Sequence, residues 1–370
     1  MKRYLEKHVK KDLQKKMVLI SGPRQCGKTT FAKSLLQKSD TYLSWDDPID
    51  QETILNYQWP SRSSMLVLDE IHKYKRWRNL VKGLFDKRKD DLRILVTGSA
   101  KLDHYRKGGD SLQGRYFHFR MHPLTFNEIG QTRDVLENLL RYGSFPEPFL
   151  GKSTDQSLRW SKNYRFRLIR DEVASLENIK DISLIEAMTH RLPITVSSTL
   201  SINSLREDLG VAHASVEHWI KILESLFLVF RIHPFSGNIL QSLKKEPKLY
   251  FFDYLNVQNE SARFENLIAL HLLKECHLKE DLSGDEYRLA YYRDKSKREV
   301  DFVIVKNQNP VEMIECKWNE KDVSPSLKYL KQKFPNCKAT QVLWAPKIDF
   351  TNQYDIRVCS ADIFLKEREV

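Results

Sequence analysis

The 370-residue sequence has few cysteines and no long apolar run. Its five cysteines form no C-x-x-C pair and no Cys/His spacing typical of a metal site, which argues against a disulfide framework and a zinc module. An odd, scattered set of cysteines fits a reducing compartment, so we expect a cytoplasmic protein. No apolar stretch approaches the roughly 18–20 residues that a membrane span needs, and no membrane partner is expected. Internal repeats and low-complexity segments are also lacking.

Acidic residues are outnumbered by basic ones, 49 to 61, which gives a formal net charge of +12. The cations cluster in segments 1–16, 73–93 and 159–170, and the last two segments also contain aromatic residues. Cations beside aromatic rings suit phosphate binding and base stacking, so a nucleic-acid partner is expected, DNA in preference to RNA. For any single segment the preferred interpretation is plainer: a solvated helix face with its aromatic rings turned to the core.

A complete phosphate-binding loop occupies residues 22–30. The pattern G-x-x-x-x-G-K-[ST] stands between a short apolar run and a helix-like stretch, the context of a true loop rather than a chance glycine-rich turn. Backbone N–H groups of such a loop converge on phosphate oxygens, and the helix N-terminus adds its positive dipole end. Lys28 is expected to reach the β- and γ-phosphates of ATP, and the Thr29 hydroxyl to hold Mg²⁺. The expected ATP-binding residues of the loop are Gly22, Pro23, Arg24, Gln25, Cys26, Gly27, Lys28, Thr29 and Thr30.

Two acids follow the apolar run 65–68. Asp69 is expected to hold Mg²⁺ through water. Glu70 is expected to polarise the attacking water as general base, a role typically worth about 10²–10⁴-fold in rate. A third strand, 93–96, is followed by two hydroxyl side chains, Thr97 and Ser99. One of them is expected to sense the γ-phosphate, and the sequence does not separate the two. The alternative for Asp69 and Glu70 is an exposed acidic turn after a core strand. The alternative for Thr97 and Ser99 is an ordinary strand-end turn.

Residues 1–150 are predicted to form an α/β P-loop ATPase domain with the nucleotide at the carboxyl ends of the strands. One strand falls between the loop and the strand of Asp69 in the sequence, which favours the additional-strand branch of P-loop ATPases. The expected strands are 17–21, 41–46, 65–69, 93–98 and 116–120.

Residues 151–240 are predicted to form a helical lid and a winged helix. Two helices, 201–210 and 213–226, are separated by a tight turn and followed by a strand, 227–233. A winged helix ordinarily inserts its second helix into the major groove of DNA. The exposed positions of this second helix are close to neutral, however, so a protein-contact lid on the ATPase is the alternative.

Residues 241–370 carry a second set of catalytic residue types. Asp301 begins one strand, and Glu315 and Lys317 lie two apart on the next strand and hence on one face. The order helix, three strands, helix and strand, with this D…E-x-K spacing, is that of restriction-endonuclease-like nucleases of the PD-(D/E)xK type. Asp301 and Glu315, supported by Glu265, are expected to bind Mg²⁺ near a scissile phosphate, and Lys317 to position or deprotonate water. A structural salt-bridge cluster is the alternative.

Nearly the whole chain resembles the bacterial and archaeal AAA-type ATP-binding proteins that carry a C-terminal domain of unknown function. The resemblance implies an additional-strand ATPase, a winged helix and a nuclease-like terminus, without a settled substrate. It rests on Gly22-Pro23-Arg24-Gln25, Leu68-Asp69-Glu70-Ile71, Gly98-Ser99, Gly114-Arg115, His122-Pro123-Leu124-Thr125-Phe126, Phe145-Pro146-Glu147 and Arg298-Glu299-Val300-Asp301-Phe302.

Two residues depart from that pattern. Ser144 stands where a second glycine is expected, and Cys26 stands where the loop usually has a small aliphatic residue. A thiol beside Lys28 and a helix N-terminus gains thiolate character, so alkylation is predicted to block ATP binding. The alternative is a small filler without a redox role. Arg115, after the sensor strand, is a candidate for contacting the γ-phosphate, in cis or from a neighbouring copy, with a surface salt bridge as the alternative.

The sequence therefore predicts a Mg²⁺-dependent ATPase coupled to a nuclease-like domain that acts on nucleic acid, with a homo-oligomer or a protein partner also compatible. The alternative is an ATP-controlled binding switch whose nuclease-like domain grips a nucleic-acid or protein partner without cutting it. A small-molecule kinase is disfavoured because Glu70 directly follows Asp69, as in hydrolases that activate water.

Overall fold

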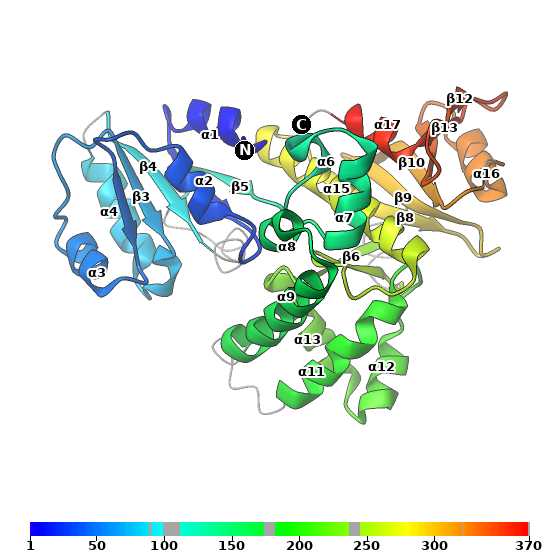
Figure 1. The fold of residues 1–370 in the computed structure, drawn as a ribbon, viewed down its shortest axis with the longest axis horizontal. Helices are drawn as coiled ribbons and strands as arrows, with labels where there is room; N and C mark the ends of the chain where they lie inside the picture. The colour runs from blue at the N-terminus through cyan, green and yellow to red at the C-terminus, as the bar shows by residue number, and fades with distance from the viewer. Residues whose placement is uncertain (89–90, 99–111, 174–181, 237–244, 321, 369–370) are drawn as a thin grey trace. The chain divides into compact units, whose positions relative to one another are not determined.

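The computed structural model describes residues 1–88, 91–98, 112–173, 182–236, 245–320 and 322–368. They form two compact units: an N-terminal unit, Met1–Pro123 with Ser225–Phe227, and a C-terminal unit, Leu124–Glu224 with Leu228–Val370. Figure 1 gives the order of the elements along the chain. Among the described residues, no helix combines the length and the apolar character that crossing a membrane requires.

The N-terminal unit contains a five-stranded parallel sheet in the order β2-β3-β4-β1-β5. The predicted α/β sheet is confirmed, although two strands end earlier than expected: the second at Ser44 instead of residue 46, and the fourth at Thr97 instead of residue 98. Strand β4 lies between β1 and β3, as an additional-strand arrangement requires. The strands are β1 (Met17–Ser21), β2 (Thr41–Ser44), β3 (Met65–Asp69), β4 (Arg93–Thr97) and β5 (Tyr116–Arg120).

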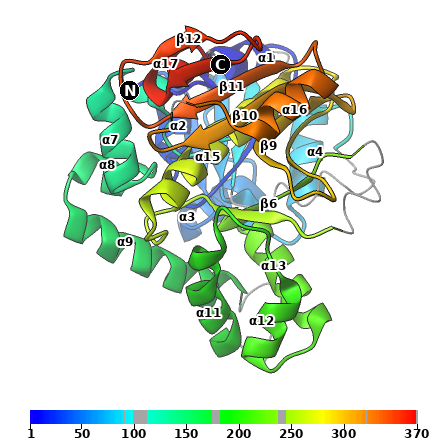
Figure 2. The ribbon, with the colours of Figure 1, turned by 90° about the vertical axis from the view of Figure 1, so that its right-hand side faces the viewer.

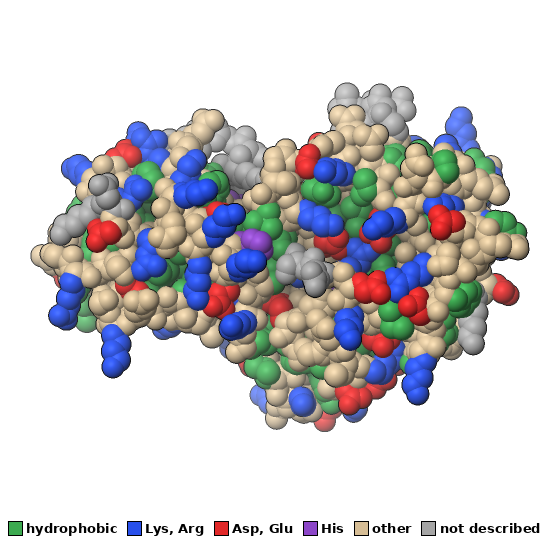
Figure 3. Space-filling view, turned by 90° about the horizontal axis from the view of Figure 1, so that it is seen from above, with side chains coloured by type: hydrophobic (Ala, Val, Ile, Leu, Met, Phe, Trp, Pro, Cys, Tyr) green, Lys and Arg blue, Asp and Glu red, His purple; other side chains and the backbone are tan. Residues whose placement is uncertain are grey.

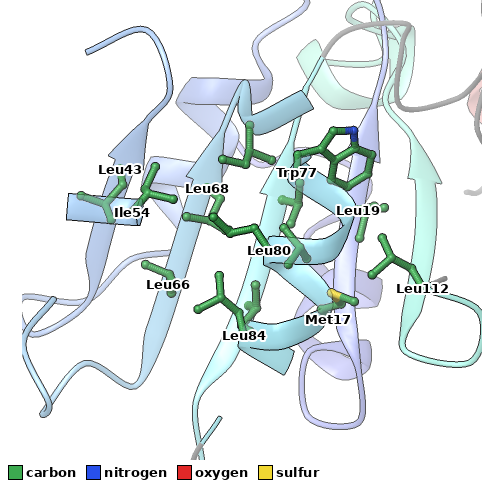
Figure 4. Packing of buried hydrophobic residues seen from close by; sticks show 14 residues of the cluster. Met17, Leu19, Leu43, Ile54, Leu66, Leu68, Trp77, Leu80, Leu84 and Leu112 are labelled. Carbon is green, nitrogen blue, oxygen red and sulfur yellow. The ribbon is translucent and has the colours of Figure 1, made fainter. Parts of the chain in front are cut away.

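Helix α4 (Trp77–Lys87) covers one face of this sheet. Its apolar residues recur with helical period and are buried against alternate residues of the strands, such as Met17 and Leu19 of β1 (Figure 4). The intervening residues Val18 and Ile20 point to the opposite face and are also fully buried. The other helices of the unit are α1 (Glu6–Asp12), which contacts β1, α2 (Lys28–Ser34), which contacts β4, and α3 (Pro48–Leu55).

The C-terminal unit begins with helices. The expected helix pair is present as α12 (Ile202–Leu209) and α13 (His213–Ser225), with Gly210 at a left-handed φ of 67° ending α12. The strand that follows pairs both with β7 and, in parallel, with β8, so it belongs to the large sheet of this unit. The preceding helices are α6 (Phe126–Ile129), α7 (Arg133–Tyr142), α8 (Pro146–Gly151), α9 (Thr154–Arg167), the π-helix η3 (Leu168–Val173), α11 (Ile182–Arg191) and the 3-10 helix η4 (Leu192–Thr195).

The sheet of the C-terminal unit has eight described strands in the order β12-β13-β11-β10-β9-β8-β6-β7. Helix α15 (Glu260–Leu282) contacts β7 to β10, and α16 (Pro325–Lys333) contacts β9 to β11 (Figure 2). The expected order of helix, three strands, helix and strand is present. The strands are β6 (Val229–Pro234), β7 (Lys248–Phe251), β8 (Tyr287–Arg293), β9 (Glu299–Lys306), β10 (Asn309–Lys317), β11 (Lys338–Leu343), β12 (Asp349–Thr351) and β13 (Arg357–Ser360), and α17 (Ala361–Lys366) ends the described fold.

A β-bulge interrupts β9 at Asp301. Tyr292 pairs with Val300 whereas Ala290 pairs with Val303, so the single residue Tyr291 lies opposite Asp301 and Phe302. A bulge redirects the side chains of the bulged strand, and bulges are common beside functional sites. Strict alternation along β9 therefore does not predict where the Asp301 side chain points.

Candidate functional site

The phosphate-binding loop runs from the end of β1 to the start of α2. Gly22 has a φ of 155°, and a Cβ there would lie 2.2 Å from the carbonyl oxygen of Met121, so only glycine fits. Gly27, at a φ of 98°, precedes α2. The buried Lys28 folds back over the loop, where its Nζ donates to the carbonyls of Gly22 at 2.9 Å and Pro23 at 2.6 Å. The loop thus holds an ammonium group whose hydrogen bonds go to neutral acceptors.

Three hydroxyl groups converge on the Asp69 carboxylate at the carboxyl end of β3. Thr29 Oγ1 and Tyr42 OH each donate to Oδ2 at 2.7 Å, and Thr97 Oγ1 donates to Oδ1. Thr29 and Asp69 are the residues expected to hold Mg²⁺, and their oxygen atoms are the ligand type that this ion prefers, so the residues fit the ion. Thr97, one of the two expected sensor hydroxyls, belongs to this network, whereas Ser99 lies outside the described residues. Tyr42 is a member that no sequence motif indicated.

Glu70 follows Asp69 in an unusual backbone conformation. Its φ of 55° lies in the left-handed region, which costs a non-glycine residue on the order of 1 kcal/mol and is found preferentially at functional sites. Its N–H donates to the Thr97 carbonyl at 2.9 Å, which fixes the turn. Burial raises the pKa of the Glu70 carboxyl, and Lys28 and Lys73 oppose that rise. A partly buried carboxylate with a raised pKa is suited to accepting a proton from water.

The remaining loop residues differ in exposure. Arg24 is half-buried, whereas Gln25 and Thr30 are exposed. Cys26 is fully buried, and its Sγ donates to the Met121 carbonyl at 3.7 Å. A buried thiol reacts with an alkylating reagent only when the loop opens, so this burial favours the alternative role of Cys26 as a filler.

Two residues near the N-terminus that no sequence motif indicated support this region: Arg3 contacts the loop itself, and Tyr4 contacts the end of β5. Arg3, only 8% exposed, donates to the carbonyl of Cys26 at 2.8 Å and to that of His122 at 2.6 Å. Tyr4 OH donates to the Arg120 carbonyl at 2.8 Å. In the sequence, Arg3 was only one cation of a basic segment, because nothing local signals a partner more than 100 residues away.

Arg115 lies in a surface ion pair. Its Nε and Nη2 atoms contact the two carboxylate oxygens of Asp86 at 2.7 and 3.1 Å. This bidentate contact favours the salt-bridge interpretation of Arg115 over a contact with the γ-phosphate.

The predicted basic segments with aromatic residues are only partly exposed. Trp77 and Tyr164 are buried, as the plainer interpretation of these segments expects, whereas Phe166 is exposed. On the sides of the two units that Figure 3 shows, Lys and Arg side chains lie among acidic, hydrophobic and other polar groups.

In the C-terminal unit, an unexpected lysine joins the predicted carboxylates. Lys248, at the start of β7, is 0% exposed. Its Nζ lies 2.8 Å from Glu299 Oε1, 3.1 Å from Asp301 Oδ1 and 3.4 Å from Glu265 Oε1. Burial alone lowers the pKa of this ammonium, but Tyr250 and the carboxylates outweigh burial and hold that pKa well above its ordinary value. Three carboxylates within 3.4 Å are the partners that a buried ammonium ion requires, and Lys248 together with these three acids forms what we call the carboxylate cluster.

The other predicted residues of this region lie beside the carboxylate cluster. Lys317 Nζ contacts Glu315 Oε1 at 3.1 Å, and the second oxygen of Glu315 accepts the Asp301 N–H at 3.4 Å. Burial, and after it the proximity of Asp301, raises the pKa of the carboxyls of both Glu265 and Glu315. The structure thus brings together Glu265, Asp301, Glu315 and Lys317 as the sequence predicted, and adds Lys248 and Glu299.

A cavity of about 900 Å³ opens onto these residues. Asp301, Glu265 and Lys317 line it, together with polar side chains from α15 and the segment before it, such as Asn259. The carboxylate cluster is therefore reachable from solvent on this side.

Comparisons with known families divide the chain into three parts. Residues 14–130 match a family described as an AAA domain. Residues 133–254 match a domain of unknown function, DUF8612, and residues 260–358 match another, DUF4143.

Similar curated proteins are themselves described as uncharacterized. A protein of Mycobacterium tuberculosis is 26% identical over 246 residues, which cover 64% of this chain and 54% of that protein, so the match spans about half of the relative. A protein of Haemophilus influenzae is 20% identical over 365 residues, covering 85% of this chain and 90% of the relative. A protein of Methanocaldococcus jannaschii is 22% identical and covers 90% and 81%, respectively.

Solved structures resemble the chain only distantly. The Aeropyrum pernix ORC1 protein in complex with DNA has a TM-score of 0.33 at 14% identity, covering 70% of this chain and 88% of that one. A DNA polymerase III gamma subunit-related protein of Thermotoga maritima has a TM-score of 0.27 at 15% identity, covering 60% and 77%. Likeness at this level carries no argument about function. The family match, the parallel sheet and the loop agree, however, that residues 14–130 have the fold of an AAA-type P-loop domain.

Proposed function

We propose that the N-terminal unit binds Mg-ATP and hydrolyses it. The observation that carries this proposal is the convergence of Lys28 and Thr29, at the start of α2, on Asp69 and Glu70, at the carboxyl end of β3. The AAA domain match over residues 14–130 supports nucleotide binding by the same residues.

Each side chain has a distinct part in this reaction. Lys28 exchanges its carbonyl partners for the β- and γ-phosphates, which costs the loop little because both partners are neutral. Thr29 and Asp69 would hold Mg²⁺, which would neutralise part of the phosphate charge when bound. Glu70 orients the attacking water and accepts its proton, and its raised pKa makes it a stronger base than an exposed carboxylate.

The substitution Glu70→Gln tests this assignment. It keeps the shape of the side chain and removes the base, so turnover should fall by about 10²–10⁴-fold while ATP binding is retained. Lys28→Met is the matched control, because it should lose ATP binding itself. ATP turnover in Glu70→Gln at the rate of the unaltered protein would remove Glu70 from its role.

We further propose that the ATPase controls contact of the C-terminal unit with a nucleic acid. The net charge of +12 supports a polyanionic partner. Two roles are compatible with Asp301, Glu315 and Lys317 lying together: metal-dependent cleavage of the partner, or an ATP-controlled grip without cleavage. Because Lys248 lies within the carboxylate cluster, we favour the grip.

A combined cleavage and binding assay separates the two roles. Single- and double-stranded DNA and RNA are incubated with Mg²⁺ or Mn²⁺, with and without ATP, and binding is followed by fluorescence anisotropy. We expect intact substrates, and binding that depends on ATP and is lost in Lys28→Ala. Cleavage that disappears in Asp301→Ala would establish a nuclease instead, and loss of that cleavage in Lys28→Ala would show that ATP gates it.

A further inference from the structure

We propose that Lys248 is the resident cation of the carboxylate cluster, and that its ammonium group takes the place a divalent metal would need between Asp301 and Glu265. This inference deepens the proposed grip without cleavage. It predicts that the cluster binds neither Mg²⁺ nor Mn²⁺ in the unaltered protein.

The position of the ammonium group carries the first step. Lys248 Nζ lies within 3.4 Å of an oxygen of each of Glu265, Glu299 and Asp301, and two of these acids, Asp301 and Glu265, belong to the predicted metal site. The side chain is completely buried, and the Lys248 backbone is fixed by pairing with Ile232 of β6 and with Thr199. A metal entering this space would meet the positive charge of Lys248, whose side chain is buried and cannot swing out into solvent.

The carboxylate oxygens carry the second step, because each oxygen of the predicted metal ligands already accepts a hydrogen bond or an ion pair from the protein. Glu265 Oε1 accepts from Lys248 and, at 2.6 Å, from Tyr250 OH, and Glu265 Oε2 accepts from Ser197 Oγ. Asp301 Oδ1 contacts Lys248, and Oδ2 accepts the Cys316 N–H at 2.9 Å. These donors hold the carboxylate oxygens in place.

Glu315 completes the set, since Lys317 engages one of its oxygens and the Asp301 N–H donates to the other. Binding a metal here would require exchanging these donors in addition to displacing Lys248. Buried carboxylates satisfied by protein donors are stable without a metal, provided that every partner remains in place.

Access does not explain the exclusion of a metal. The cavity of about 900 Å³ is lined by Asp301, Glu265 and Lys317, so ions in solution can reach the acids. Exclusion therefore depends on Lys248, and removing its charge should create a metal site where the unaltered chain has none.

Mn²⁺ binding to the full chain without nucleotide tests the proposal, measured by electron paramagnetic resonance of free Mn²⁺ and by titration calorimetry. The unaltered protein and Asp301→Asn should give the same titration. Lys248→Met should gain one bound Mn²⁺ per chain, and Lys248→Met combined with Asp301→Asn should lose it again. Lys317→Met, which removes a cation from the same region and leaves Lys248 in place, should gain none.

Two outcomes would overturn the proposal: a Mn²⁺ site in the unaltered protein that Asp301→Asn abolishes, or a folded Lys248→Met that gains no site. If Lys248→Met is unfolded without metal, recovery of its circular dichroism on adding Mn²⁺ supports the proposal. If it stays unfolded, the comparison of the unaltered protein with Asp301→Asn decides. The grip is tested separately by ATP-dependent anisotropy, so either idea can fail while the other stands.

Discussion

Two buried lysines, one in each unit, have opposite surroundings. Lys28 of the N-terminal unit donates to two backbone carbonyls of its own loop. Lys248 of the C-terminal unit is surrounded by three carboxylates on β9 and α15. The first ammonium group is held by neutral acceptors and gains from meeting a phosphate, whereas the second already has its counter-charges. Burial of a cation alone therefore does not mark a ligand site; the charge of its partners decides.

The contrast extends to the acids of the two units. Asp69 accepts from three hydroxyl groups, which can turn toward a metal without leaving a charge unpaired. Asp301 accepts from an ammonium and a backbone N–H, which cannot. We infer that the N-terminal site is built to exchange ligands and that the carboxylate cluster is built to stay closed.

The largest expected effect separates the two lysines by stability. Lys248→Met leaves buried carboxylates without their cation and should lower the free energy of unfolding by about 3–5 kcal/mol. Lys28→Met removes only hydrogen bonds to carbonyls and should cost about 1 kcal/mol. Urea denaturation of both variants measures the difference.

Lys306→Met is the control for charge removal, because Lys306 pairs with Asp285 in an exposed ion pair and its loss should leave the free energy of unfolding nearly unchanged. An equal loss in Lys28→Met and Lys248→Met would remove the distinction between the two sites.

How far the sequence predicted the sites follows the same division. The nucleotide site could be predicted from the sequence because its loop is contiguous and because Asp69 and Glu70 directly follow an apolar run. Both signals are local, and each places its residues at the carboxyl end of a strand. Asp301, Glu315 and Lys317 could be predicted from strand alternation and from their spacing. Lys248 was not, because it lies 53 residues before Asp301 at the start of a four-residue strand and meets that acid only through sheet packing.

The second prediction is that a buried histidine makes the C-terminal unit less stable in acid. His271 is buried in α15, where its Nε2 accepts the Phe126 N–H at 3.1 Å and its Nδ1 donates to the Leu267 carbonyl at 2.8 Å. The bond from Phe126 requires the neutral ring, because a protonated Nε2 cannot accept, whereas the bond to Leu267 can be made in either protonation state. Burial, with a smaller contribution from Lys274, lowers the pKa of His271 to about 4, while Glu128 acts in the opposite direction.

Because that pKa is lower in the folded than in the unfolded chain, the unfolded chain binds the proton first as the pH falls. Neutral His271 contributes about 3 kcal/mol to the free energy of unfolding above pH 6.5. This contribution is lost as the pH falls from 6.5 to about 4. Urea denaturation across this range should show a flatter pH dependence in His271→Gln. Substitution of the exposed His190 by Gln is the control, and an unchanged slope in His271→Gln would contradict the prediction.

A third, smaller effect concerns how the loop around Lys28 is held. Arg3→Ala removes the two hydrogen bonds to the Cys26 and His122 carbonyls and should weaken ATP binding about tenfold, the equivalent of about 1.4 kcal/mol. Arg3→Lys keeps the charge but not the forked geometry of the guanidinium, so its ATP affinity should lie between those of Arg3→Ala and the unaltered protein. Substitution of the nearby exposed Lys2 by Ala is the control. ATP affinity unchanged in Arg3→Ala would show that the loop needs no support from the N-terminus.

The smallest effect tests whether Asp69 is as exchangeable as the contrast with Asp301 implies. Tyr42→Phe removes one of three hydroxyl donors and leaves Thr29 and Thr97, so the carboxylate loses orientation but no counter-charge. We expect a loss of about 1 kcal/mol, seen as a several-fold higher Mg²⁺ requirement for ATP turnover, with ATP affinity in the absence of Mg²⁺ unchanged. Tyr57→Phe, on an exposed side chain, should change neither quantity. If Tyr42→Phe instead destabilised the chain as strongly as Lys248→Met, Asp69 would be as dependent on its partners as Asp301, and the division between an exchanging site and a closed cluster would fail.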